Sequence, residues 1–77
     1  MSLNRQFTHH SHVHRFVVSL GDRGWEVREE EDTVVLSRVQ RVDWHRVERD
    51  IQQFERKAEA LRQAGWIEEL AGLAQGS

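Results

Sequence analysis

The fold is decided by the stretch DWHRVERDIQQFERKAEALRQAG, residues 43–65. Asp43 is a typical helix N-cap, because its carboxylate can accept a hydrogen bond from a free first-turn N–H. Gly65 is a typical helix stop, because it readily takes the left-handed conformation that ends many helices. The apolar residues between them recur every three or four positions, which places them on one stripe of an α-helix. These residues are Trp44, Val47, Ile51, Phe54, Ala58 and Leu61.

Three β-strands are predicted upstream of this helix. Residues 12–20 alternate in polarity and are rich in valine, which is typical of a strand, and the two glycines of residues 21–24 indicate a tight hairpin. Residues 25–30 then form a second strand, with Trp25 and Val27 on one face. The acidic run 29–32 is predicted to be a turn, since packed like charges avoid burial, and residues 33–41 form the third strand.

The third strand carries apolar residues on both of its faces. Val34 and Leu36 share one face, while Val35 and Val39 share the other. This pattern is typical of a strand that is covered on both sides. In a three-stranded meander the second strand is central, so the pattern suggests that another chain covers part of the third strand.

The expected fold is therefore α+β, with a three-stranded antiparallel meander covered by one long amphipathic helix. A short C-terminal helix or tail follows Gly65. Residues 12–77 form a single domain. Residues 1–11 are polar and show no periodicity, so we expect them to be a flexible arm.

Length and composition favour a homodimer. A chain of 77 residues without cysteine is too short to bury a large core and has no disulfide to compensate. The predicted helix would be roughly 33 Å long, which exceeds what a short sheet can cover. Its far end and the residues after it therefore need a partner. The expected interface residues are Phe54, Leu61, Trp66, Ile67 and Leu70.

Four histidines lie within six positions near the N-terminus. If the first strand extends back through them, His10, His12 and His14 share a face, and imidazoles two apart on a strand can chelate Zn²⁺, Ni²⁺ or Cu²⁺. No acidic residue lies nearby in sequence to complete such a site. An incidental polar cluster is therefore the favoured interpretation, with a metal site or a pH-sensing role as alternatives.

Arginines gather where the third strand meets the helix, and they support an alternative role in nucleic-acid binding. They are Arg38, Arg41, Arg46 and Arg49. The order of three strands and a helix also resembles the plant-type and integrase-arm DNA-binding domains, which read DNA with a sheet face rich in Arg and Trp. Here the corresponding strand offers Glu26, Arg28 and Glu30 instead. With a net charge of −2, we interpret the arginines as a solvated face.

Enzymatic chemistry finds little support in the sequence. There is no cysteine or tyrosine, and no glycine-rich phosphate loop or nucleophile elbow. We therefore expect a non-catalytic protein-interaction or self-associating domain without a cofactor. No apolar run is long enough to span a membrane and no secretory signal is recognisable, so a cytoplasmic location is expected.

Overall fold

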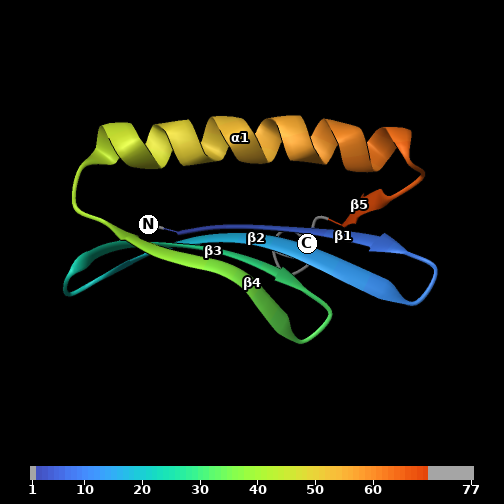
Figure 1. The fold of residues 1–77 in the computed structure, drawn as a ribbon, viewed down its shortest axis with the longest axis horizontal. Coiled ribbons are helices and arrows are strands. Elements are labelled where there is room, and N and C mark those ends of the chain that lie inside the picture. Colours follow the sequence, from blue (N-terminus) through green and yellow to red (C-terminus); the bar gives the residue numbers. More distant parts are fainter. Residues whose placement is uncertain (1, 70–77) are drawn as a thin grey trace, which may run out of the picture.

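Among residues 2–69, five β-strands form one antiparallel sheet, and a single helix lies across one of its faces (Figure 1). This computed structural model describes residues 2–69. The elements in chain order are β1 (Ser2–His9), β2 (His12–Gly21), β3 (Gly24–Glu31), β4 (Val34–Arg41), α1 (Trp44–Gln63) and β5 (Ile67–Glu69). The sheet order is β4-β3-β2-β1-β5, so the first four strands form a meander and β5 returns to pair with β1.

The expectation of three strands is wrong, because the sheet has five. The stretch predicted to be a flexible arm contains β1, which pairs with β2 along its whole length, and the predicted terminal helix or tail begins with β5. Each of these strands has a charged residue at an inward position, where the alternation predicts an apolar one. These residues are Arg5 in β1 and Glu68 in β5, and they pair with each other at 2.8 Å. The order β-β-β-α, which carried the resemblance to DNA-binding domains, is therefore not the observed one.

The helix and both of its ends are confirmed. The Asp43 carboxylate accepts a hydrogen bond from the His45 N–H at 2.9 Å, which caps the first turn. At the other end, the Trp66 N–H donates to the Leu61 carbonyl and the Gly65 N–H donates to the Arg62 carbonyl. This pair of bonds is a Schellman motif, and Gly65 adopts the left-handed conformation that it requires, with φ of +100°.

The core lies between the helix stripe and the inner face of the sheet. Its buried members are Phe7, Phe16, Val18, Val27, Val47, Phe54 and Ala58. The Phe54 ring stacks on the Phe16 ring with centroids 4.6 Å apart, and Phe7 meets Phe16 edge-on at 5.9 Å. These aromatic contacts join the helix to the two strands at the middle of the sheet.

The loops of the meander follow the predicted turn chemistry in part. Gly24 has a φ of +104°, and a Cβ there would lie 2.7 Å from the Arg41 carbonyl oxygen, so only glycine fits. In the turn between β3 and β4, Asp32 takes the left-handed conformation with φ of +57°. The acidic run itself is mostly strand rather than turn, since β3 continues to Glu31.

A β-bulge explains the broken alternation in β4. Glu29 pairs with Ser37, but Glu30 pairs with Val35, so Leu36 is an extra residue on the β4 side. A bulge of this kind shifts the phase of the side chains by one residue. The two-sided apolar pattern therefore reflects a local irregularity in an edge strand, not a central position in the sheet.

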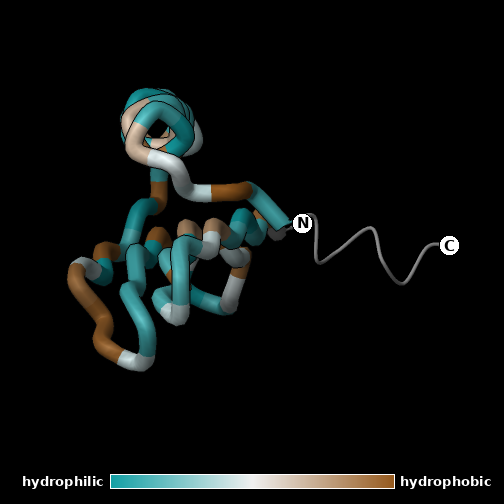
Figure 2. The backbone as a smooth tube through the Cα atoms, turned by 90° about the vertical axis from the view of Figure 1, so that its right-hand side faces the viewer, coloured by the Kyte–Doolittle hydropathy of each residue, from teal (hydrophilic) through white to brown (hydrophobic). Residues whose placement is uncertain are grey.

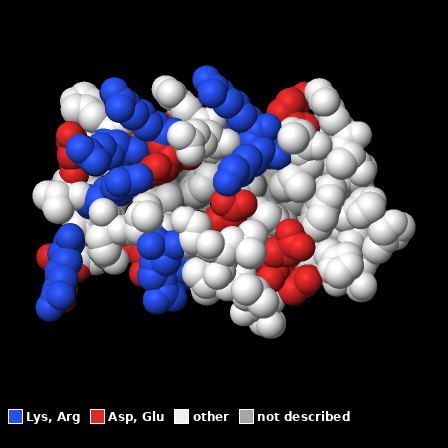
Figure 3. Space-filling view, viewed as in Figure 1, with Lys and Arg blue, Asp and Glu red and all other residues white. Residues whose placement is uncertain are grey.

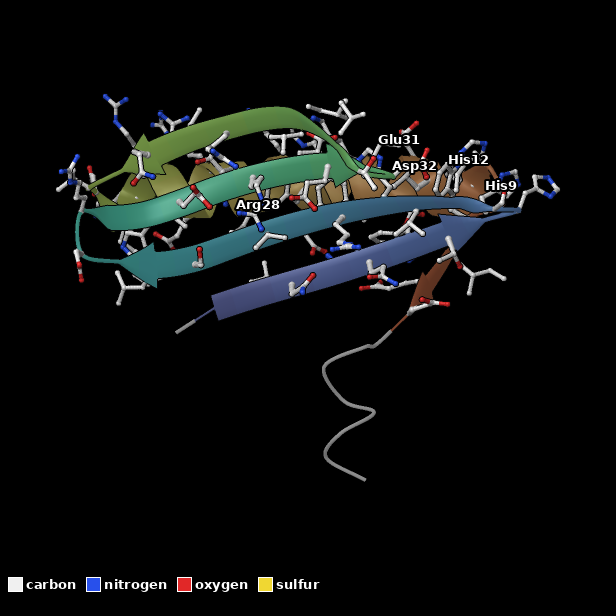
Figure 4. The ribbon with its side chains drawn as sticks, turned by 90° about the horizontal axis from the view of Figure 1, so that it is seen from below. His9, His12, Arg28, Glu31 and Asp32 are labelled. Carbon is white, nitrogen blue, oxygen red and sulfur yellow. The ribbon has the colours of Figure 1, made fainter. Side chains whose placement is uncertain are left out.

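The face of the sheet opposite α1 has no covering layer among residues 2–69, and charged side chains lie along it (Figure 4). Arg28 lies 2.7 Å from both Glu26 and Glu30, and Arg15 lies 3.7 Å from Glu30. The Arg28 Nε–H is not aligned with Glu30 well enough to form a hydrogen bond, so we regard that contact as an ion pair only. The charged side chains on this face are therefore paired with one another. No helix within residues 2–69 is both long and apolar enough to cross a bilayer.

Candidate interaction surfaces

Among the described residues, three consecutive exposed apolar residues lie at the start of β4, at the open edge of the sheet. Val34, Val35 and Leu36 have exposed fractions of 59%, 42% and 54%. Figure 2 shows this apolar segment as brown tube at the lower left, well away from the helix. Within the described chain no strand pairs with the outer side of β4, so its outward N–H and C=O groups are also available. We call β4, with these groups and side chains, the β4 edge.

The opposite edge of the sheet is partly closed by a charged clamp. β5 pairs with Gln6, Phe7 and Thr8 of β1. The Arg5 guanidinium donates two hydrogen bonds of 2.8 Å to the Glu68 carboxylate, and Arg62 of α1 donates another of 2.8 Å. The hydrogen bonds from Arg5, followed by those from Arg62, lower the pKa of Glu68 to about 2. This clamp fixes β5 to both β1 and the end of the helix.

The residues predicted to form an interface are mostly packed within their own chain. Phe54 is in the core and Leu61 packs against it. The Trp66 ring stacks on His9 at 5.4 Å and meets His14 edge-on at 6.2 Å. Ile67 is 69% exposed, while Leu70 lies outside the described residues. The strands β1 and β5, which the three-stranded prediction lacked, widen the sheet beside β2 and provide packing partners for the far end of the helix.

Three of the four predicted arginines come together beside the first turns of the helix. Arg41, Arg46 and Arg49 line a shallow hollow of about 230 Å³, together with Asp50 and Gln53. The Arg41 guanidinium pairs with the Asp50 carboxylate at 3.0 Å, and this contact raises the pKa of Arg41. Among the described residues, Arg46 and Arg49 form no ion pair, so the hollow carries excess positive charge. Arg38 lies instead on the uncovered face of the sheet, 3.5 Å from Glu26.

Of the three histidines predicted to share a strand face, His12 and His14 do so but His10 does not. His10 lies in the turn between β1 and β2, with φ of +56°, while His12 and His14 are in β2. His12 contacts Asp32 at 3.1 Å, and Figure 4 shows this pair at the end of the sheet beside Glu31. Within residues 2–69, no three His, Asp or Glu side chains are arranged to hold a metal ion.

His14 is instead the centre of a buried charged cluster that the sequence did not reveal. Its Nε2 lies 2.8 Å from Glu29 and its Nδ1 lies 3.0 Å from Glu31, so both ring nitrogens face carboxylates. Lys57 of α1 also donates to Glu29 at 2.7 Å. Burial raises the pKa of Glu29, but Lys57 and His14 together outweigh burial and hold that pKa below its usual value. The cluster therefore joins β2, β3 and the helix.

A second hollow runs between the helix and the β4 side of the sheet. It has a volume of about 160 Å³, and Val27, Val39 and Phe54 provide apolar lining while Gln53 and Lys57 line it from α1.

Comparisons with models of protein families, with curated proteins and with solved structures found no match to this chain. Inferences about function therefore rest on the surfaces described above.

Proposed function

We propose that this protein is a non-catalytic, self-associating domain that forms a homodimer through the β4 edge. The observation that supports this proposal is the exposure of three consecutive apolar residues, Val34 to Leu36, on an edge strand whose outer side pairs with no other strand among residues 2–69. Exposed apolar edges invite pairing with another strand, and proteins usually protect them with charges, short strands or a covering element. Here the other edge has such protection, while the apolar half of β4 has no charged residue between Thr33 and Ser37.

Strand addition supplies two favourable contributions at once. The outward backbone groups of β4 gain hydrogen-bond partners, and the exposed valines and leucine lose contact with water. Burying an aliphatic side chain contributes roughly 1.5–3 kcal/mol, and each apolar residue counts twice in a symmetric dimer. The chain also gains the buried area that a 77-residue domain lacks by itself.

Replacing Leu36 with lysine should weaken the dimer by at least about tenfold in its dissociation constant, because a charge replaces a buried aliphatic group. Light scattering over a concentration series would measure the change. Leu20→Lys is a matched control, since Leu20 is 53% exposed against 54% for Leu36 but lies at the end of β2, away from the β4 edge. A wild-type chain that remains monomeric at high micromolar concentration would contradict the proposed function.

A second candidate function is nucleic-acid binding at the arginine hollow. It is favoured by one observation, namely that Arg41, Arg46 and Arg49 line the same hollow although β4 and α1 contribute them separately. Guanidinium groups gathered in this way suit phosphate groups. The overall charge of −2 weakens this candidate, because long-range attraction to a polyanion would be small.

The double variant Arg46→Ala/Arg49→Ala tests this second candidate. If the hollow binds phosphates, the variant should lose most of the affinity for a fluorescently labelled oligonucleotide at low salt. The slope of log K against log salt should also fall in magnitude by about 2. Arg23→Ala/Arg56→Ala is the control, because it removes the same charge from exposed positions outside the hollow. Absence of binding by the wild type at low salt and micromolar protein would eliminate the idea.

A further inference from the structure

The β4 edge has opposite charges at its two ends. It begins beside Glu31 and Asp32, whose side chains are each 45% exposed, and it ends with Arg38 and Arg41. The Arg38 side chain is 56% exposed. Figure 3 looks onto this side of the molecule: Lys and Arg atoms lie at its left and along its top, whereas the charged atoms at the lower right belong to Asp and Glu. The apolar segment Val34 to Leu36 lies between the charged ends.

We propose that the partner of the β4 edge is the β4 edge of a second copy, paired antiparallel about a two-fold axis. This inference rests on the proposed self-association and specifies its geometry. Antiparallel pairing brings the acidic start of each strand against the basic end of the other, and it does so twice. A parallel arrangement would instead oppose like charges at both ends, which disfavours it.

The charges select the direction of pairing, and the apolar segment supplies most of the affinity. Exposed ion pairs contribute only about 0–1 kcal/mol each, so the dimer should depend weakly on salt. With the two-fold axis between Leu36 and Ser37, the two Leu36 side chains lie nearest the axis, and Val34 and Val35 of each strand lie opposite Val39 and Arg38 of the other. The edge is therefore complementary to itself in charge at its two ends, with Leu36 of both copies near the axis.

The two-fold axis also fixes where the helices lie. An axis that relates two neighbouring antiparallel strands stands perpendicular to the sheet, so both copies of α1 lie on the same face of one continuous sheet. Each helix leaves the side of β4 that faces it largely uncovered. The two paired β4 strands would lie about 4.8 Å apart, as neighbouring strands in a sheet do. Each copy has a hollow between its helix and its β4 strand, and in the dimer these two hollows face each other across the paired strands. Arg46 and Arg49 of both copies then lie along the space between the two helices.

Spin labels on single cysteines would test this geometry, since the chain has no native cysteine. Thr33→Cys, Ser37→Cys and Gln40→Cys place labels at the start, middle and end of the exposed strand. In the antiparallel dimer, the distance between the two Ser37 labels is the shortest. The Thr33 pair and the Gln40 pair are each about 20 Å apart in backbone terms, given roughly 3.3 Å per residue. A refolded mixture of the Thr33 and Gln40 variants should give a new, short distance.

The other outcomes show whether the pairing direction alone is wrong or the proposed function as well. Short distances within all three pairs would indicate parallel pairing and overturn the antiparallel inference. Long distances within all three pairs, in a protein whose mass is that of a dimer, would mean that the chain self-associates through another surface. A monomeric mass at the concentrations used for labelling would overturn both. Circular dichroism of each labelled variant checks that the sheet and helix are retained.

Discussion

Replacing Phe54 with alanine should lower the free energy of unfolding by about 3–5 kcal/mol. Phe54 is 6% exposed, and its ring stacks on Phe16 at the centre of the contact between α1 and the sheet. Truncation removes this stacking and leaves a cavity beside Phe16 that the rigid sheet cannot close. Domains have net stabilities of roughly 0.05–0.15 kcal/mol per residue, so the loss is a large fraction of the total for this chain.

Urea unfolding followed by circular dichroism would measure this loss, at one fixed protein concentration because the proposed dimerisation would contribute to apparent stability. Phe54→Leu keeps most of the side-chain volume and should cost less than about 1.5 kcal/mol. If the alanine variant fails to fold, the stability of the leucine variant can still be compared with that of the control. Ile67→Ala is the control, because Ile67 is 69% exposed and its truncation should change stability by about 0.5 kcal/mol or less. A Phe54 variant with unchanged stability and weakened dimerisation would show that Phe54 lies at an interface.

The helix was predictable because every signal that defines it is local. Asp43 and Gly65 act within one turn of the helix ends, and the apolar spacing depends only on the helical period. The hairpin at Gly21–Gly24 was predictable for the same reason. These features require no knowledge of distant contacts.

The strands β1 and β5 were not predictable from alternation, because an ion pair between distant residues replaces an apolar contact. Arg5 and Glu68 are 63 positions apart, and each interrupts the apolar pattern of its own strand. Their charges are compensated only once the two strands meet. The local sequence pattern treats Arg5 and Glu68 as exposed residues, so neither stretch is predicted to be a strand.

The candidate surfaces were predictable only in part. The apolar residues 34–36 drew attention to β4 in the sequence. The bulge that places apolar residues on both faces of this strand could not be predicted, because it depends on pairing with β3. The arginine hollow was partly anticipated, since Arg41, Arg46 and Arg49 are close in sequence, whereas Arg38 falls on the other face. No local signal indicated that an acid within the run 29–32 would be buried.

The second large effect is expected from Glu29, where replacement with alanine should cost about 2–4 kcal/mol. Removing one partner from a buried charged group is costly, because it leaves the other partner without compensation. Here Lys57 is 53% exposed at its side chain and can return to water, but the His14 side chain is 8% exposed and cannot. His14 would keep only Glu31 as a carboxylate partner. Glu59→Ala, at a carboxylate that is 60% exposed, should cost about 0.5 kcal/mol or less in the same urea experiment.

The pH dependence of stability identifies the charge of Glu29 as the cause. The pKa of Glu29 is lower in the folded chain than its usual 4.5, so the folded state binds fewer protons than the unfolded state as the pH falls through this range. The stabilisation is therefore complete above about pH 4.5 and is lost on acidification, and the Glu68 clamp behaves in the same way down to a pKa of about 2. Glu29→Gln should be less stable than the wild type at pH 7, and the difference should shrink as the pH falls from 5 to 3. A difference that is constant across that range would show that lost packing, rather than lost charge, destabilises the variant.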